Sequence, residues 1–195
     1  MLKNDNAIHA GIFGIEGLSL NSDEVDFFTS LNQLGFILFA RNIDKPAQVL
    51  ALTNSLRDIT GRKHTPILID QEGGRVQRMT RPHWNKYPPA RPFGTLYETN
   101  PEQSIQDTLT NAQSISMDLT AVGVNVDCLP LLDVPISGAD KIIGDLAFSM
   151  DKDIVTVLGS VQANGLLSKG VLPVIKHMPG HGRASIAILT TSGEQ

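Results

Sequence analysis

The sequence has 195 residues, which suits a single domain at roughly 150 residues per domain. Hydrophobic residues make up 41% and charged residues 18%, a globular composition that excludes a disordered tail and a fibrous protein. A net charge of −4 without any Lys/Arg block argues against a nucleic acid or an anionic membrane surface as partner.

Short apolar runs alternate with longer amphipathic stretches along the chain. In chain order, the pattern predicts a strand at 7–13, a helix at 22–34, a strand at 35–42, a helix at 46–60 and a strand at 66–70. It then predicts a helix at 101–121, a strand at 125–134, a helix at 151–169 and a strand at 171–177. Ser22 is the expected N-cap of the first helix, and Pro46 lies in the first turn of the second. Five continuously apolar strands separated by helices predict an α/β fold with a parallel sheet buried on both faces.

Polar residues follow four of the predicted strands directly. They are Arg41 and Asn42, then Asp70, Gln71 and Glu72, then Asp133, and finally Lys176 and His177. Ligands bind at the carboxyl ends of the strands in (β/α) barrels and in doubly wound sheets. One such cluster has an ordinary explanation, since polar residues naturally follow a buried strand, but four of them predict a binding site at this end of the sheet.

Several classes of site have no support in the sequence. There is no GxGxxG after the first strand, no Walker-type GKS or GKT, no CxxC pair and no HExxH, so the sequence supports neither a phosphate-cradling loop nor a structural zinc site. The single cysteine, Cys128, cannot form an internal disulfide, which favours a reducing compartment. No apolar run approaches the roughly 18 residues of a membrane span, and no signal peptide is evident. These features predict a cytoplasmic protein that acts on a small molecule.

Two segments carry most of the chemical information. The first, DQEGGRVQR at 70–78, places two glycines after two acids, which permits a tight turn with positive φ that presents Asp70. A carboxylate there can accept hydroxyl groups, and Arg78 can donate in a fork to oxygens, although a solvated, salt-bridged turn is the simpler alternative. The second, KHMPGHGR at 176–183, offers the donors of Lys176 and His177 ahead of a glycine-hinged loop.

Together these segments resemble the β-N-acetylhexosaminidases of glycoside hydrolase family 3, bacterial cytoplasmic enzymes of peptidoglycan recycling. The family has D-Q-E-G-G-R-V-x-R after its third strand and K-H-x-P-G-H-G after its fifth, and the resemblance covers residues 7–184. It implies a TIM barrel, of which about the first five βα units are present. It also implies that Asp70, Arg78, Lys176 and His177 hold a terminal N-acetylglucosamine, without metal or cofactor, in a retaining glycosidase.

The sequence departs from the family in three ways. The Asp-Ser-His triplet that follows the second motif and supplies the acid/base His is missing, and so is the nucleophilic Asp expected after a later strand. Leu146 stands where the family usually has Arg in I-G-x-R-x-F, which removes a donor from the sugar site. His181 is a conceivable substitute base, but a structural role in the loop motif is the stronger interpretation. The chain is therefore expected to be an inactive fragment.

The last residues suggest a reason for the missing triplet. The stretch ILTTS at 188–192 can be encoded by bases that, read one frame over, give Asp-Ser-His-His-Leu. We therefore divide the chain into a partial barrel domain at 1–185 and a frameshifted tail at 186–195. Five strands of an eight-stranded barrel would also leave the first and fifth strands unpaired.

Two other functions fit the same residues. One is a catalytically dead N-acetylglucosamine-binding protein that keeps the four binding residues Asp70, Arg78, Lys176 and His177. The other is a different TIM-barrel enzyme that uses Glu72 and Asp133 as its pair of carboxylates.

Overall fold

The computed structural model describes residues 7–138, 142–178 and 180–182, so the proposed tail at 186–195 lies outside the described residues. The elements follow in the order β1 (His9–Phe13), α1 (Ser22–Leu31), β2 (Gln33–Leu38), η1 (Ala40–Asn42), α2 (Pro46–Thr60), β3 (Ile67–Ile69), β4 (Gln71–Gly73), β5 (Val76–Gln77), α3 (Arg91–Tyr97), α4 (Pro101–Ala121), β6 (Val126–Asp127), η2 (Gly144–Leu146), α5 (Lys152–Leu167) and β7 (Leu172–Pro173).

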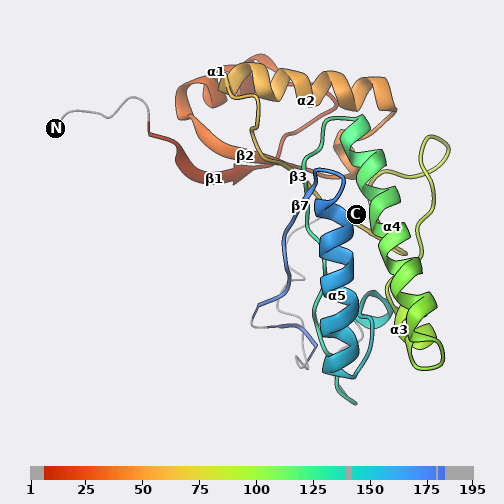
Figure 1. Cartoon of the computed structure of the whole chain (residues 1–195). Helices are drawn as coiled ribbons and strands as arrows, with labels where there is room; N and C mark the ends of the chain where they lie inside the picture. The colour runs from red at the N-terminus through yellow and green to blue at the C-terminus, as the bar shows by residue number, and fades with distance from the viewer. Residues whose placement is uncertain (1–6, 139–141, 179, 183–195) are drawn as a thin grey trace.

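The main sheet has five parallel strands in the order β1-β2-β3-β6-β7, so each strand lies beside the next of these five along the chain (Figure 1). This confirms the predicted strand count and the parallel βα arrangement. The strands are shorter than predicted, most clearly at 125–134, where β6 ends at Asp127. Pro130 has no amide hydrogen to donate to a ladder, and only an isolated bridge between Leu131 and Lys176 continues the pairing.

The helix boundaries follow their capping signals. Helices α2 and α4 have the predicted limits, and each begins with a proline in its first turn. Helix α1 corrects one prediction, because Ser22 is its first helical residue and Asn21 is the cap. The Asn21 side chain accepts the amide of Glu24 at 2.9 Å, and the Glu24 carboxylate accepts the amide of Asn21 at 3.1 Å. This reciprocal pair satisfies two free amides at the start of the helix.

The two faces of the sheet have different neighbours. Phe13, Phe36 and Ile67 are in register with one another and pack in the main hydrophobic core beneath the helices. The opposite face carries Ile37, Leu68, Val126 and Leu172 in one row across four strands. Figure 1 shows α1 and α2 on one side of the strands and α4 beside α5 on another, which leaves a concave side without a helix.

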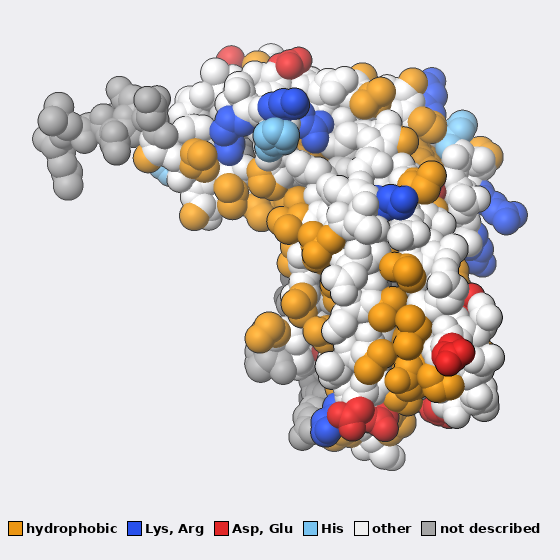
Figure 2. All heavy atoms as spheres, in the orientation of Figure 1, with side chains coloured by type: hydrophobic (Ala, Val, Ile, Leu, Met, Phe, Trp, Pro, Cys, Tyr) orange, Lys and Arg blue, Asp and Glu red, His pale blue; other side chains and the backbone are white. Residues whose placement is uncertain are grey.

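Every position of the central strands β3 and β6 is buried, as predicted, whereas the edge strands β1 and β7 have no buried position. The edge strands carry the exposed positions, with Ile12 of β1 44% exposed and Leu172 of β7 56% exposed. Figure 2 shows hydrophobic side chains at the surface along the concave edge of the molecule. Among the described residues, no helix has the length and apolar character needed to cross a bilayer.

Candidate functional site

A cavity of about 320 Å³ lies at the carboxyl ends of β3 and β7, where parallel sheets bind their ligands. One wall is polar and the other is apolar. The polar wall contains all four residues predicted to bind the sugar, together with one acid and one further histidine: Asp70, Glu72, Arg78, Lys176, His177 and His181. The apolar wall contains Val76, Leu131, Ile142, Ile143 and Leu146, and Arg75 completes the lining.

The first motif folds as a hairpin, β4–β5, that the strand prediction missed. Its turn has positive φ at Gly73 (89°) and Gly74 (59°), as the paired glycines predict. A Cβ atom on Gly73 would collide with the carbonyl oxygen of Pro88, so only glycine permits this approach. The buried Gln71 amide oxygen accepts the backbone amide of Arg78 at 3.0 Å, which fixes the start of that side chain beside the cavity.

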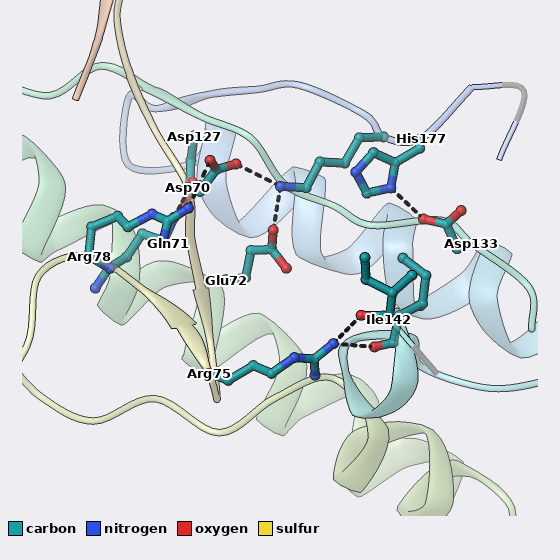
Figure 3. Close-up of polar contacts among 11 residues, drawn as sticks. Asp70, Gln71, Glu72, Arg75, Arg78, Asp127, Asp133, Ile142 and His177 are labelled. Carbon is teal, nitrogen blue, oxygen red and sulfur yellow. Dashed lines mark hydrogen bonds and ion pairs between the residues drawn. The ribbon is translucent and has the colours of Figure 1, made fainter. Parts of the chain in front are cut away.

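Lys176 joins the two motifs across a separation of more than 100 residues. Its Nζ donates to Oδ1 of Asp70 at 2.7 Å and also contacts Oε1 of Glu72. The other oxygen of Asp70 lies 3.5 Å from Nη2 of Arg78 (Figure 3). The Asp70, Lys176 and Glu72 side chains are largely buried, so they form a compact network of alternating charge on the cavity wall.

Burial and charge act against each other on the pKa values of this network. Burial acts to raise the pKa of Asp70, but Lys176 and Arg78 outweigh it and hold that pKa below its ordinary value. For Glu72 burial prevails, and its pKa is raised despite the contact with Lys176. Burial acts to lower the pKa of Lys176, but the carboxylates of Glu72 and Asp70 raise it above its ordinary value. Lys176 therefore stays a cation and Asp70 an anion at neutral pH.

The second motif is anchored by Asp133, whose side chain is fully buried. Its Oδ2 lies 2.7 Å from Nδ1 of His177 (Figure 3). Its Oδ1 accepts the backbone amides of His181 and, at 3.2 Å, Gly182. The carboxylate makes all these contacts within the protein. This arrangement disfavours the reading in which Asp133 and Glu72 serve as a catalytic pair, since a nucleophile must reach the substrate.

Leu146 is buried, with 7% of its surface exposed, and packs with Leu131, Ile143 and Ala147 against Val76. It faces the cavity at the position where the family motif has Arg. The wall opposite the charged network is therefore apolar.

Two predicted strand-end residues do not belong to the site. Arg41 donates from Nε to the carbonyl oxygen of Ile15 at 2.9 Å, and the buried Asn42 donates to the carbonyl oxygens of Ile15 and Gly17. They hold the segment after β1 in place, which is a structural role. The polar character of a strand end therefore does not say whether backbone or ligand takes its hydrogen bonds.

Sequence reasoning missed two residues near the site. Arg75 crosses the cavity to the segment at 142–145, and its position directly after the paired glycines was the available signal. Asp127, at the end of β6, is fully buried, and burial raises its pKa well above the ordinary value. Beside it, burial raises the pKa of the Cys128 thiol to about 12. Within the described ranges, no group of three or more His, Cys, Asp or Glu side chains is placed to hold a metal ion.

Comparisons with known proteins give a consistent family. The model for the glycosyl hydrolase family 3 N-terminal domain matches residues 14–188. A beta-hexosaminidase from Xylella fastidiosa is 33% identical over 173 residues, which cover 88% of this chain and 50% of that protein. A beta-hexosaminidase from Nitrosomonas eutropha is 39% identical over 150 residues, which cover 76% of this chain and 42% of that protein. The chain thus spans about half the length of the curated relatives it matches.

Solved structures show the same fold. The crystal structure of NagZ from Neisseria gonorrhoeae in complex with N-trifluoroacetyl-D-glucosamine matches with a TM-score of 0.85 at 26% identity, covering 94% of this chain and 54% of that one. A glycoside hydrolase family 3 beta-N-acetylglucosaminidase from Paenibacillus matches with a TM-score of 0.82 at 28% identity, covering 90% of this chain and 33% of that one. The five-stranded sheet and its helices therefore correspond to part of a longer chain in these proteins.

Proposed function

Since the chain belongs to glycosyl hydrolase family 3 through its match to the family's N-terminal domain, we propose that its cavity binds a terminal N-acetyl-β-D-glucosamine residue. The observation that carries this proposal is the position of Asp70 between Lys176 and Arg78 on the cavity wall. A carboxylate flanked by two cations offers acceptors and donors side by side, which suits the vicinal hydroxyl groups of a sugar. The apolar wall suits the C–H face of the ring or an acetyl methyl group.

Unpaired polar atoms at the cavity support a hydroxyl-rich ligand. Oε2 of Glu72 and Nε of Arg78 are buried and have no hydrogen-bond partner within the described residues. Buried polar atoms are nearly always paired, so such atoms around a cavity favour a ligand or water that completes them. The N-trifluoroacetyl-D-glucosamine in the gonococcal NagZ structure gives an example of a matching sugar in a similar protein.

The reaction we propose for the complete protein is retaining hydrolysis of N-acetyl-β-D-glucosaminides from peptidoglycan fragments in the cytoplasm. Such a mechanism needs a carboxylate nucleophile and a separate proton donor around the glycosidic bond. Within the described residues, Glu72 is held by Lys176 and Asp133 is enclosed by protein contacts. We therefore propose that the chain as given binds the sugar without hydrolysing it, because its groups contact ground state and transition state alike.

We further propose that the sheet is the first five strands of a (β/α)₈ barrel. The sequential strand order supports this, because each strand of such a barrel pairs with the next along the chain. The row Ile37, Leu68, Val126 and Leu172 would then face the barrel interior. The remaining strands would correspond to the half of the curated relatives that this chain does not match.

A chimera tests the enzymatic proposal. Residues 1–182 of this chain would replace the matched part of the Nitrosomonas eutropha relative, and release of p-nitrophenol from p-nitrophenyl N-acetyl-β-D-glucosaminide would be followed. We expect hydrolysis by the chimera, a loss of hydrolysis in its Asp70→Ala variant, and none by the chain alone. A folded chimera that neither binds nor cleaves the substrate would overturn the proposed function, and hydrolysis by the chain alone would overturn the binding-only proposal.

A further inference from the structure

Arg75 stands at the tip of the β4–β5 hairpin, and this tip is fixed to the protein on its far side. The amide of Gly74 donates to the carbonyl oxygen of Tyr87 at 2.9 Å, and Gly73 lies against the backbone of Pro88. The hairpin is thus a rigid support, and the side chain of Arg75 extends from it across the cavity lining (Figure 3).

The guanidinium group of Arg75 contacts three acceptors on one short segment. Nη2 donates to the carbonyl oxygen of Ile142 and, at 3.1 Å, to that of Ile143, while Nη1 pairs with the carboxylate of Asp145. Arg75 and Asp145 are about half exposed, and an exposed ion pair by itself contributes little. The two backbone carbonyls make the contact specific, because they fix the path of the chain and not only a side chain.

This segment supplies most of the apolar wall of the cavity. Ile143 is 4% exposed and Leu146 is 7% exposed, and both pack against Leu131. The segment has little regular structure of its own, being a single 3₁₀ turn at Gly144–Leu146. A second arginine, Arg91, donates to the carbonyl oxygen of Gly144 at 3.3 Å from outside the cavity lining. The position of the wall therefore depends on side chains that reach it from elsewhere in the sequence.

We infer that Arg75 is a positioning residue that holds the 142–146 segment as the apolar wall facing Asp70 and Lys176, so that the cavity is preformed for a sugar. The ligand part of this inference rests on the proposed function. An arginine is required because its planar fork presents several N–H groups in fixed directions, whereas a lysine offers one flexible ammonium. Preforming the wall would strengthen binding, because the free protein then has less to order when the sugar arrives.

The test compares Arg75→Ala, Arg75→Lys and Asp145→Asn with the unchanged chain. Two quantities are measured: amide hydrogen exchange over residues 142–147 without ligand, and the Kd for N-acetyl-D-glucosamine. We expect Arg75→Ala and Arg75→Lys each to speed exchange and to weaken sugar binding by about tenfold, the scale for losing charge-assisted hydrogen bonds. Asp145→Asn should have a smaller effect, because both carbonyl contacts remain. Lys152→Ala removes a remote, exposed ion pair with Asp153 and serves as the matched control.

Two results would overturn the inference. One is an Arg75→Ala variant with exchange and Kd within twofold of the unchanged chain. The other is full retention of both properties in Arg75→Lys, which would reduce the role of Arg75 to its charge. If Arg75→Ala fails to fold, Arg75→Lys and Asp145→Asn still give these measurements. If the chain binds no sugar at all but the Arg75 variants exchange faster over residues 142–147, Arg75 does position the 142–146 segment and only the proposed function is refuted. The two failures are therefore distinguishable.

Discussion

The Nδ1 atom of His177 lies 2.7 Å from Oδ2 of Asp133, and this contact sets the tautomer of the histidine. A carboxylate only accepts hydrogen bonds, so Nδ1 carries the proton and donates it. In a neutral ring Nε2 is then an acceptor. His177 was expected to be one of several donors to a sugar, but with the proton on Nδ1 a neutral ring has only an acceptor, Nε2, left for a ligand.

Asp133→Asn should reverse this tautomer. The amides of His181 and Gly182 require the oxygen of the new side chain, which turns its NH₂ group toward Nδ1 of His177. The proton then moves to Nε2, and we expect the affinity for N-acetyl-D-glucosamine to fall about tenfold as an acceptor becomes a donor. The ¹⁵N shifts of the His177 ring report the tautomer. Asp118→Asn, which alters a remote bond to Tyr87, is the control. An unchanged tautomer in Asp133→Asn would contradict this account.

Asp127 should make the stability of the chain depend on pH. Its carboxyl group is fully buried, with Oδ1 accepting the amide of Gln71 at 3.0 Å and Oδ2 without a partner in the described part of the chain. Burial raises its pKa well above the ordinary value, so the folded state keeps a proton that the unfolded state releases. The contribution of Asp127 to the free energy of unfolding therefore falls as pH rises from the unfolded pKa toward the folded one.

Asp127→Asn should remove that penalty. We expect its free energy of unfolding, relative to the unchanged chain, to increase as the pH rises above the ordinary aspartate pKa of about 3.9, because an amide does not titrate. Denaturant titrations at several pH values measure the difference, and Asp153→Asn on the exposed start of α5 is the control. A difference that is the same at every pH would show that Asp127 does not titrate as its burial requires.

Leu146→Arg should strengthen sugar binding while weakening the fold. The arginine restores a donor at the cavity, and one hydrogen bond to a charged group corresponds to about tenfold in Kd. The same change places a longer, charged side chain among Leu131, Ile143 and Ala147, where overpacking typically costs about 1–3 kcal/mol. Calorimetric titration and thermal melting measure the two effects. Leu146→Met keeps the volume and adds no donor, so it should change neither; tighter binding by that variant would refute the donor explanation.

The exposed sheet edge should promote self-association. Strand β7 ends the five-stranded sheet, and Leu172 on it is 56% exposed beside Val174 and Ile175, which are also exposed. An unpaired apolar edge is a template for pairing with another chain, and a charge on such an edge blocks it. We expect Leu172→Lys to lower the association seen by light scattering, whereas Met117→Lys, at an exposed position on α4, should not. Equal association in both variants would place the contact elsewhere.

Helix starts and turn conformations could be predicted from the sequence where neighbouring residues alone decide them. Pro46 and Pro101 mark the first helical residues of α2 and α4, since a proline there loses no helix hydrogen bond. The positive φ of Gly73 and Gly74 followed from the paired glycines. Asn21, and not Ser22, caps α1 because it forms a reciprocal pair with Glu24. The spacing of Asn21 and Glu24 is a known capping signature, which the prediction of Ser22 overlooked.

Features that depend on distant partners were not predictable. Arg41, Asn42 and Asp70 all follow strands, but only Asp70 lies beside the cavity, because the backbone after β1 takes the hydrogen bonds of the other two. Arg75 and Asp127 form hydrogen bonds with segments more than 50 residues away in the sequence. The motifs did identify four residues that the fold brings to one cavity; their roles in sugar binding stay predictions.

The central claim is that Asp70 and its two cationic neighbours bind N-acetyl-D-glucosamine, and calorimetric titration of the chain with this sugar tests it most directly. The account predicts one site per chain, with affinity reduced about ten- to hundredfold in Asp70→Ala, the range for a hydrogen bond to a charged group. Asp118→Ala should bind as the unchanged chain does. Absence of binding by the folded chain, or equal affinity in Asp70→Ala, would contradict the account.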